Sequence, residues 1–216
     1  MDFLPAYIND YCEKYTQKED KVLYELHRET FQKILRPRML SGHLQGQILT
    51  FFSKMINPEN ILEIGTYTGY SAICLARGLK EGGKLDTIDI NEELEDFSNS
   101  YFKKAGLEKS ITMHVGNAMD IIPKLNKQWD LVFIDADKEN YVNYYNLVFD
   151  AVKPGGFIIS DNVLWSGKVA LPVDSKDKET QVLIALAKTI DADDRVENVL
   201  MPIRDGLLVA RKKINM

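Results

Sequence analysis

Two pairs of polar residues end apolar runs in the middle of the chain, where their side chains could take part in chemistry. Asp135 and Asp137 follow "WDLVFI", and Lys138 comes directly after them. Asp161 and Asn162 follow "FIIS" in the same way. A carboxylate at the end of a buried run is costly unless a positive group meets it. The pattern therefore predicts a cation beside these residues, either a metal ion or a lysine.

Asp135, Asp161 and Asn162 form a set of hard oxygen donors if the two runs are neighbouring strands. Neighbouring strands lie about 5 Å apart, so the residues at their ends converge. Oxygen ligands without His or Cys favour Mg²⁺, Ca²⁺ or Mn²⁺ over Zn²⁺. An EF-hand loop starting at Asp135 is excluded, because Asn140 and Asn146 occupy its glycine and glutamate positions. In the structural alternative, Asp161 caps a turn and Asp135 pairs with a lysine.

A glycine turn follows an earlier apolar run, in "LEIGTYTGYS". Gly65 and Gly69 let the backbone turn sharply and approach a ligand at the start of a helix. Asp89 lies about twenty residues beyond Gly69, where an acid commonly binds a ribose diol. The chain has neither Gly-x-Gly-x-x-Gly nor Gly-Lys-Ser/Thr here. For the glycines alone, a tight turn is an equally good explanation. With Glu63 and Asp89 added, a cationic, phosphate-free nucleoside such as S-adenosylmethionine is favoured over NAD.

These residues need a sheet that brings several strand ends to one edge. Strand patterns alternate with helical patterns, which favours a doubly wound, mostly parallel α/β sheet of about seven strands. The expected strands are 60–65, 84–90, 110–116, 129–136, 157–162, 195–203 and 206–213. The last two are joined by "RDG", a hairpin signal, so one of them should run antiparallel. Ligands bind at the carboxyl ends of such strands.

The rest of the chain is consistent with one globular domain. Residues 1–57 read as an N-terminal helical segment packed on a main domain, residues 58–216, without a linker. The net charge is −5 and no long basic run occurs, which makes nucleic acid an improbable partner. Cys12 and Cys74 form no disulfide scaffold, and the acidic, proline-interrupted N-terminus is no signal peptide. With no apolar run of membrane-spanning length, the cytoplasm is the expected location.

The motifs together resemble the cation-dependent O-methyltransferases, a family that includes catechol and caffeoyl-coenzyme A O-methyltransferases and bacterial relatives. The resemblance covers about residues 35–213 and is carried by "LEIGTYTGYSA", "TIDIN", "FIDADKENYVNYY", "VKPGGFIISDNVLWSGKV" and "PIRDGLLVARK". It implies the Rossmann-like class I methyltransferase fold and a homodimer. The stretch "RMLSGHLQGQ" stands where plant members often have threonines, so bulky coenzyme A esters are not implied.

The resemblance also implies which residues form the site. S-adenosylmethionine would be held by residues of the N-terminal segment and the strand ends: Met39, Ser41, Glu63, Gly65, Tyr67, Ser71, Asp89, Ala118, Asp135 and Asp137. The cation, with Mg²⁺ preferred and Ca²⁺ or Mn²⁺ as alternatives, would be ligated by Asp135, Asp161 and Asn162. Lys138 matches the general base of the family.

Aromatic residues near the motifs could contact an acceptor. Tyr141 and Trp165, with Lys138, form the predicted acceptor side, although aromatic residues near loops are as often part of a core. Lys138 itself could equally be a surface lysine at the start of a helix. His43 and His114 have no evident partners.

Three classes of function follow from these residues. The first is methylation of a vicinal dihydroxy aromatic compound, whose two oxygens would fill two of about three free positions on an octahedral ion. Lys138 would take the proton of the metal-bound phenol. The second is a tRNA hydroxyuridine O-methyltransferase, disfavoured by the missing basic stripe. The third is a non-catalytic nucleoside-binding protein, disfavoured by the complete set of metal ligands and lysine.

Overall fold

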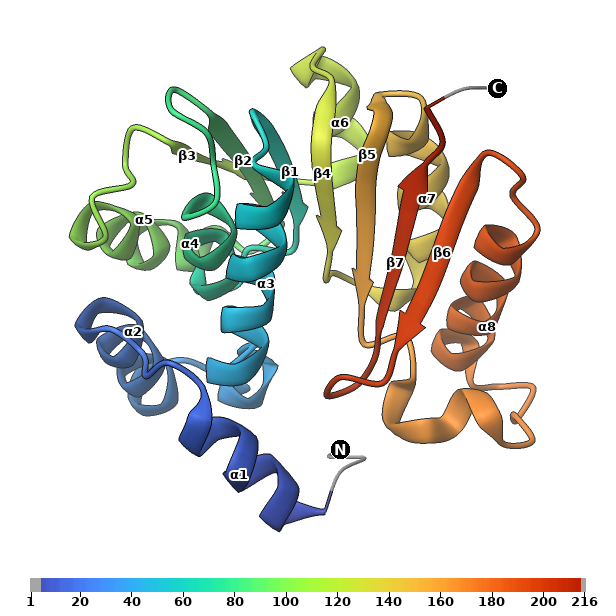
Figure 1. Cartoon of the computed structure of the whole chain (residues 1–216), viewed down its shortest axis with the longest axis horizontal. Coiled ribbons are helices and arrows are strands. Elements are labelled where there is room, and N and C mark those ends of the chain that lie inside the picture. The colour runs from blue at the N-terminus through green and yellow to red at the C-terminus, as the bar shows by residue number, and fades with distance from the viewer. Residues whose placement is uncertain (1–4, 215–216) are drawn as a thin grey trace.

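A seven-stranded sheet forms the centre of the computed structural model, which describes residues 5–214 (Figure 1). Its strands are β1 Asn60–Ile64, β2 Lys84–Asp89, β3 Ile111–Val115, β4 Trp129–Ile134, β5 Val152–Asp161, β6 Val196–Met201 and β7 Leu207–Lys212. Their order is β3-β2-β1-β4-β5-β7-β6. Only β7 runs antiparallel to its neighbours, β5 and β6. The predicted seven-stranded, mostly parallel sheet and its terminal hairpin are therefore confirmed.

Helices cover both faces of the sheet. The α-helices are α1 Ala6–Tyr15, α2 Lys21–Lys33, α3 His43–Ile56, α4 Tyr70–Ala76, α5 Glu95–Lys104, α6 Ala118–Leu125, α7 Tyr141–Phe149 and α8 Lys178–Asp191. Four 3-10 helices lie between them: Pro37–Met39, Glu92–Leu94, Lys138–Asn140 and Trp165–Ala170. Helices α2 to α5 share a hydrophobic cluster with one face, and α6 to α8 with the other (Figure 1). No helix among residues 5–214 combines the length and hydropathy that a bilayer span needs.

Strand β4 is buried on both faces, which explains why it reads as a continuous apolar run. Leu131 and Phe133 belong to the cluster on the α3–α4 side. Val132 and Ile134 belong to the cluster on the α7–α8 side. Because successive side chains of a strand point to opposite faces, every one of these positions must be apolar. The buried apolar run, and with it β4, ends at Ile134, and the carboxylate of Asp135 follows directly.

Strand β5 begins earlier than the predicted start at residue 157. Val152 pairs with Trp129, and the next pair along the strands is Phe157 with Leu131. The residues between form a bulge that contains Gly155 with φ 83°. The predicted strand begins only after "KPGG", whereas the bulge lets β5 include these residues as extra length. The predicted start of β5 is therefore wrong, but the position of Asp161 at the other end of the strand does not depend on it.

The N-terminal helices share the core of the sheet domain. Leu26 of α2 and Leu49 of α3 belong to the same buried cluster as Ile61 of β1. Helix α3 approaches α4 closely at Gly46, where a Cβ atom would lie 2.6 Å from the ring of Tyr70. The start of α3 is thereby held against the sheet, at the level of the strand ends.

Candidate active site

The carboxyl ends of β1, β4 and β5 meet at one edge of the sheet. Asp135 follows the last residue of β4, and Asp161 is the last residue of β5. The two strands are parallel neighbours, and their register pairs Ile134 with Ser160. Asp135 therefore lies beside Asp161, as the sequence predicts for neighbouring strands.

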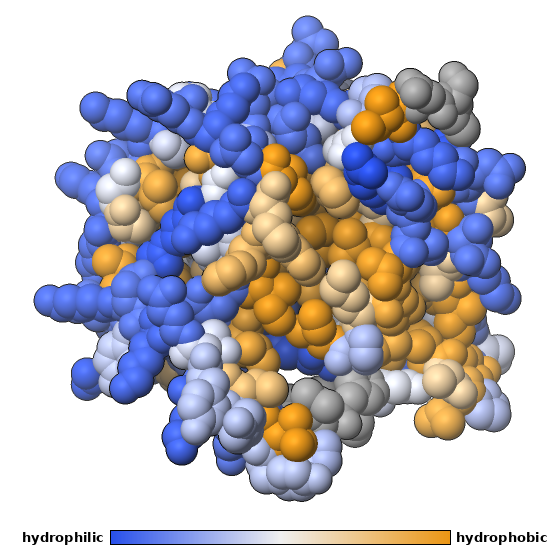
Figure 2. Space-filling model, viewed as in Figure 1, coloured by the Kyte–Doolittle hydropathy of each residue, from blue (hydrophilic) through white to orange (hydrophobic). Residues whose placement is uncertain are grey.

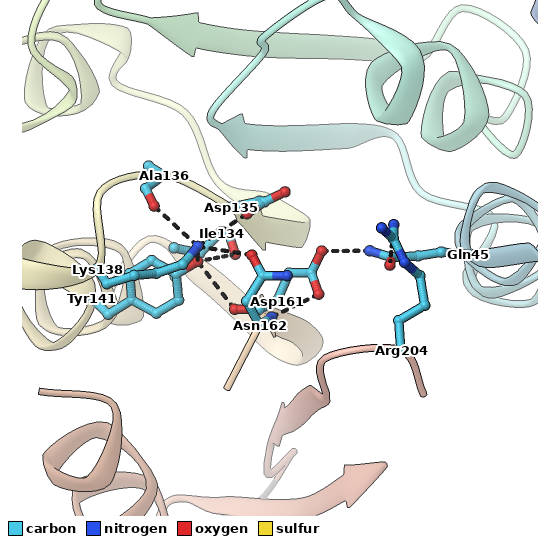
Figure 3. Close-up of polar contacts among 9 residues, drawn as sticks. All are labelled: Gln45, Ile134, Asp135, Ala136, Lys138, Tyr141, Asp161, Asn162 and Arg204. Atoms are coloured by element: carbon cyan, nitrogen blue, oxygen red, sulfur yellow. Dashed lines mark hydrogen bonds and ion pairs between the residues drawn. The ribbon is translucent and has the colours of Figure 1, made fainter. Parts of the chain in front are cut away.

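Lys138 is the positive group that meets the carboxylate at the end of β4 (Figure 3). Its Nζ donates to Asp135 Oδ1 at 3.1 Å and to Asn162 Oδ1 at 2.9 Å. It also contacts the Tyr141 hydroxyl at 2.6 Å and the Ala136 carbonyl at 3.1 Å. The short 3-10 helix Lys138–Asn140 turns the chain back so that this contact forms. The side chain is buried, so Lys138 is not a surface lysine.

Asp161 is held from two directions. One carboxylate oxygen, Oδ1, accepts from the backbone N–H of Asn162 at 2.7 Å. The other, Oδ2, accepts from Nε2 of Gln45, in the first turn of α3 (Figure 3). Asp161 is 1% exposed, and this burial, together with the charge of Asp135, raises its pKa well above its usual range. Ionisation of this carboxyl group is therefore unfavourable unless a cation lies beside it.

The oxygen donors predicted to bind a metal lie together and fit a hard cation. Asp135 Oδ1 and Asn162 Oδ1 both lie within hydrogen-bond reach of the single Lys138 ammonium. Within residues 5–214 no three His, Cys, Asp or Glu side chains gather closely enough to hold a metal ion, and the predicted set consists of two carboxylates and one amide. The arrangement also contains the structural alternative, in which Asp135 pairs with a lysine and Asp161 bonds the backbone of the following residue.

The two predicted aromatic residues have different surroundings. The ring of Tyr141 is completely buried, and its hydroxyl contacts Lys138 and, at 3.1 Å, the carbonyl of Asp161. Burial, with Asp135 and Asp161 nearby, raises the Tyr141 pKa well above its usual range. Trp165 is only partly buried, and its ring centroid lies 5.8 Å from Lys138 Nζ. Trp165 thus has a face available beside the lysine, whereas Tyr141 supports the lysine from behind.

The glycine turn after β1 brings the first strand end against the fourth. Gly65 has φ 102°, and a Cβ atom there would lie 1.9 Å from the carbonyl oxygen of Asp135. Only glycine allows this approach. Asp89, at the end of β2, accepts from the backbone N–H of Tyr67 at 2.7 Å and of Asn91 at 2.9 Å. The predicted ribose-binding acid therefore stands directly against the turn.

Glu63, in β1 beneath the turn, has an unsatisfied oxygen. Its Oε2 accepts from the Thr87 hydroxyl at 2.5 Å, whereas its buried Oε1 has no partner among residues 5–214. Burial raises the pKa of this carboxyl group to about 8. A buried oxygen without a partner is rare in proteins and often marks a functional position. With Asp89 and Asp135, Glu63 completes an acidic arc that suits a cationic ligand.

The remaining predicted cofactor residues flank this arc. Ala118 begins α6, Ser71 is buried in α4, and Asp137 accepts from the Tyr144 hydroxyl at 2.6 Å. Ser41 is buried, and Met39 is exposed. Their segment reaches the turn through the Tyr67 hydroxyl, which donates to the Leu35 carbonyl at 3.0 Å.

Two residues at this edge are not among the predicted ones. Gln45 and Arg204 both act through contacts between segments far apart in the chain, which no local motif reveals. The only signal was "PIRDG", read as a turn. The expectation that His114 lacks a partner is wrong, because its Nε2 lies 2.8 Å from Oδ1 of buried Asp86. That pair depends on the register of β2 and β3 and lies away from the site.

Comparisons with known proteins agree with this geometry. A family model described as O-methyltransferase matches residues 13–213. The caffeoyl-CoA O-methyltransferase of Medicago sativa is 34% identical over 206 residues, which cover 90% of this chain and 83% of that enzyme. The enzyme of the same name from Petroselinum crispum is 36% identical over 206 residues, covering 90% of this chain and 85% of that enzyme.

Solved structures give the same result. The O-methyltransferase from Bacillus cereus in complex with SAH superposes with a TM-score of 0.89 at 30% identity, covering 96% of this chain and 97% of that one. TomG from Streptomyces achromogenes, in complex with SAM, superposes with a TM-score of 0.87 at 28% identity, covering 96% of both chains. These findings confirm the resemblance seen in the sequence, and the chain belongs to the O-methyltransferase family.

Proposed function

We propose that this O-methyltransferase transfers the methyl group of S-adenosylmethionine to one hydroxyl of a vicinal dihydroxy aromatic compound, at a site that also holds a divalent cation. The carrying observation is the convergence of Asp135 Oδ1, Asn162 Oδ1 and Lys138 Nζ beside Asp161. This places hard oxygen ligands and a basic side chain within one hydrogen-bond shell. The caffeoyl group in the names of the plant relatives is a vicinal dihydroxy aromatic, which supports this acceptor class.

The methyl donor lies along the acidic arc formed by Glu63, Asp89 and Asp135. The free Oε1 of Glu63 offers an acceptor to a donor group of the ligand, and Asp89 offers its carboxylate to the ribose hydroxyls. The carboxylates of Asp89 and Asp135 would repel a diphosphate but suit the ammonium and sulfonium groups of S-adenosylmethionine. The Bacillus and Streptomyces structures, which contain SAH and SAM, support this choice of donor.

Asp135, Asp161 and Asn162 would hold the cation, most simply Mg²⁺, which would supply charge neutralisation and make a nearby hydroxyl more acidic. Lys138 must first release its own ammonium proton to solvent, which a cation bound beside it would favour by charge repulsion. The neutral amine then accepts the hydroxyl proton at Nζ, while Tyr141 and the Ala136 carbonyl keep it in place. The acceptor oxygen then bonds the methyl carbon as the carbon–sulfur bond breaks, and S-adenosylhomocysteine leaves. Trp165 lies beside Lys138, where its ring can contact an aromatic acceptor.

A methyl-transfer assay tests this proposal. With labelled S-adenosylmethionine and catechol, turnover should require added Mg²⁺ and stop with chelator, while calorimetry still detects binding of the donor. Asp161→Ala should lose cation affinity, and a monophenol should be a poor acceptor because it fills one metal position. Full turnover of a monophenol in the presence of chelator would overturn the proposal.

The proposal includes a homodimer. Figure 2 shows an apolar area on the face where Figure 1 shows no helix in front of β5, β7 and β6. Exposed apolar side chains of α3 and β6 include Phe51 and Met55, which are 57% and 70% exposed, and Val199, which is 48% exposed. Large exposed apolar areas commonly mark interfaces between proteins. Light scattering should show a dimer that Met55→Glu dissociates, whereas Leu171→Glu, at another exposed apolar position, should not.

Other functions receive less support. The names of the relatives give no support to the tRNA alternative, and nucleic acid is not proposed as a partner. Membership of an enzyme family counts against a non-catalytic nucleoside-binding protein. Cys12 and Cys74 are both free thiols, which fits the proposed cytoplasmic location.

A further inference from the structure

We propose that Arg204 and Gln45 act as positioning residues that fix the Asp161 carboxylate for the cation. The inference rests on the proposed function, because it concerns the same cation site. Gln45 lies between the other two side chains, with its amide group facing both (Figure 3). The three residues come from α3, the end of β5 and the β6–β7 turn, so this contact joins three distant parts of the chain.

Gln45 supplies the side-chain donor that Asp161 needs. The glutamine is fully buried, and its Nε2 donates to Asp161 Oδ2. The backbone of Asn162 occupies the other oxygen, Oδ1. A buried carboxylate that loses a donor turns toward any other donor within reach. The amide of Gln45 therefore determines how the Asp161 carboxylate is rotated.

Arg204 determines which way the amide of Gln45 points. A guanidinium group has donors and no acceptor, and Nη1 of Arg204 lies 3.1 Å from Oε1 of Gln45. The amide oxygen must face the arginine, so the amide NH₂ group must face Asp161. Without Arg204, the amide could exchange its two ends and present an oxygen to the carboxylate.

Arg204 is itself held by the segment before α3. Its Nη1 donates to the carbonyl of Leu40 at 3.2 Å and to the carbonyl of Ser41. Arg204 lies in the β6–β7 turn with φ 49°. The next residue, Asp205, accepts at Oδ1 from the backbone N–H of Ser166 at 2.5 Å. One turn thus fixes the segments on both sides of Asp161.

Metal affinity measures this role directly. Replacing groups that orient metal ligands commonly costs about 10- to 100-fold in affinity. Gln45→Met and Arg204→Met each break the same chain of contacts, so the double variant should bind Mn²⁺ no more weakly than the weaker single variant. Two independent effects would instead multiply. Mn²⁺ binding to the full-length protein, followed by electron paramagnetic resonance, gives the affinities without relying on turnover.

Two control variants separate positioning from general damage. Arg211→Met removes an arginine from the far end of β7, where it pairs with Glu197. Gln47→Met removes a half-buried glutamine two residues along α3. Neither should change the Mn²⁺ affinity. If Arg204→Met does not fold, Arg204→Gln carries the comparison, because a glutamine amide presents an acceptor as well as a donor and no longer fixes which end of Gln45 faces it.

The outcomes distinguish this inference from the proposed function. Weakened, non-additive Mn²⁺ binding with normal control variants supports the positioning role. A lowered melting temperature with unchanged Mn²⁺ affinity, or multiplicative losses, overturns it and leaves the proposed function standing. Wild-type protein that binds no Mn²⁺ or Mg²⁺ overturns both.

Discussion

The edge formed by the strand ends has an acceptor half, around Lys138 and Asp161, and a cofactor half, around Glu63 and Asp89. The two halves differ in how many of their buried polar groups have hydrogen-bond partners. On the acceptor half, Lys138 Nζ contacts four oxygen atoms, and Gln45 and Asn162 satisfy Asp161. On the cofactor half, Glu63 keeps a buried oxygen without a partner among the described residues. The acceptor half thus contains a cationic side chain, whereas the cofactor half keeps an unsatisfied acceptor. The proposed function therefore gives proton transfer and positioning to the first half and binding of the methyl donor to the second.

Removing Lys138 should have the largest effect. Lys138→Ala should lower the rate of methyl transfer by about 100- to 10,000-fold, while cation and donor still bind. The loss should shrink as pH rises, because the acceptor then ionises without help. Lys153→Ala is the matched control, since Lys153 pairs with Asp130 at the opposite end of β4. The test is the rate of methyl transfer by each variant across a pH range. An equal loss of rate at every pH would contradict the role of Lys138 as the general base.

A side chain at Gly65 should damage both halves at once. The Cβ atom of Gly65→Ala would lie 1.9 Å from the Asp135 carbonyl, and the residue would keep an unfavourable positive φ. The free energy of unfolding should fall by more than about 1–3 kcal/mol, the usual cost of the dihedral strain alone. Gly106→Ala is the control, because Gly106 has φ 70° and open space around its Cβ position. Denaturant unfolding of both variants separates the steric clash with Asp135 from the cost of the positive φ. An equal loss of unfolding free energy in the two variants would contradict the clash.

Loss of Asp89 should weaken donor binding alone. A hydrogen bond to a charged group contributes about 1.5–3 kcal/mol, so Asp89→Ala should bind S-adenosylmethionine more than about tenfold less tightly. Asp96→Ala, an exposed acid at the start of α5, should bind normally. Titration calorimetry gives both affinities, and Mn²⁺ binding to Asp89→Ala should match the wild type. An unchanged donor affinity would remove Asp89 from the site.

The last prediction concerns the stability of the unliganded protein. The pKa of Glu63 is raised from 4.5 to about 8, so the folded state holds a proton that the unfolded state releases between these values. Its contribution to stability is therefore complete below pH 4.5 and is lost as the pH rises through about 8. Glu63→Gln, which cannot ionise, should flatten this part of the pH–melting curve. Calorimetric curves of equal slope for both proteins would contradict the assignment.

Local sequence patterns correctly predicted those helices and strands whose apolar residues are the ones that become buried. Strand β4 is apolar from Leu131 to Ile134 because both faces are buried there, and Asp135 follows the end of the strand. The early start of β5 could not be predicted, because the bulge at Gly155 depends on pairing with β4. The proximity of Asp135 and Asp161 could be predicted because adjacent parallel strands bring their carboxyl ends together by topology alone.

Side-chain contacts between distant segments of the chain could not be predicted from local sequence patterns. Gln45 and Arg204 are 159 residues apart, and their contact depends on the positions of α3 and the β6–β7 turn. The interior position of Tyr141 follows from the turn that precedes it, which buries a ring that the sequence alone places near a loop. In both cases the tertiary position of a backbone segment decides the role.

The position of β7 has a consequence for the order in which the protein is made. This last strand lies between β5 and β6, and the turn before it carries Arg204. A nascent chain that has passed β5 can already bring the glycine turn and Asp135 together, but Gln45 can contact Arg204 only after the β6–β7 turn has been translated. Such long-range pairing is slow and leaves an open strand edge meanwhile. Until β7 has been translated, the edge of β5 is exposed to aggregation and Asp161 lacks the support of the Arg204–Gln45 contact.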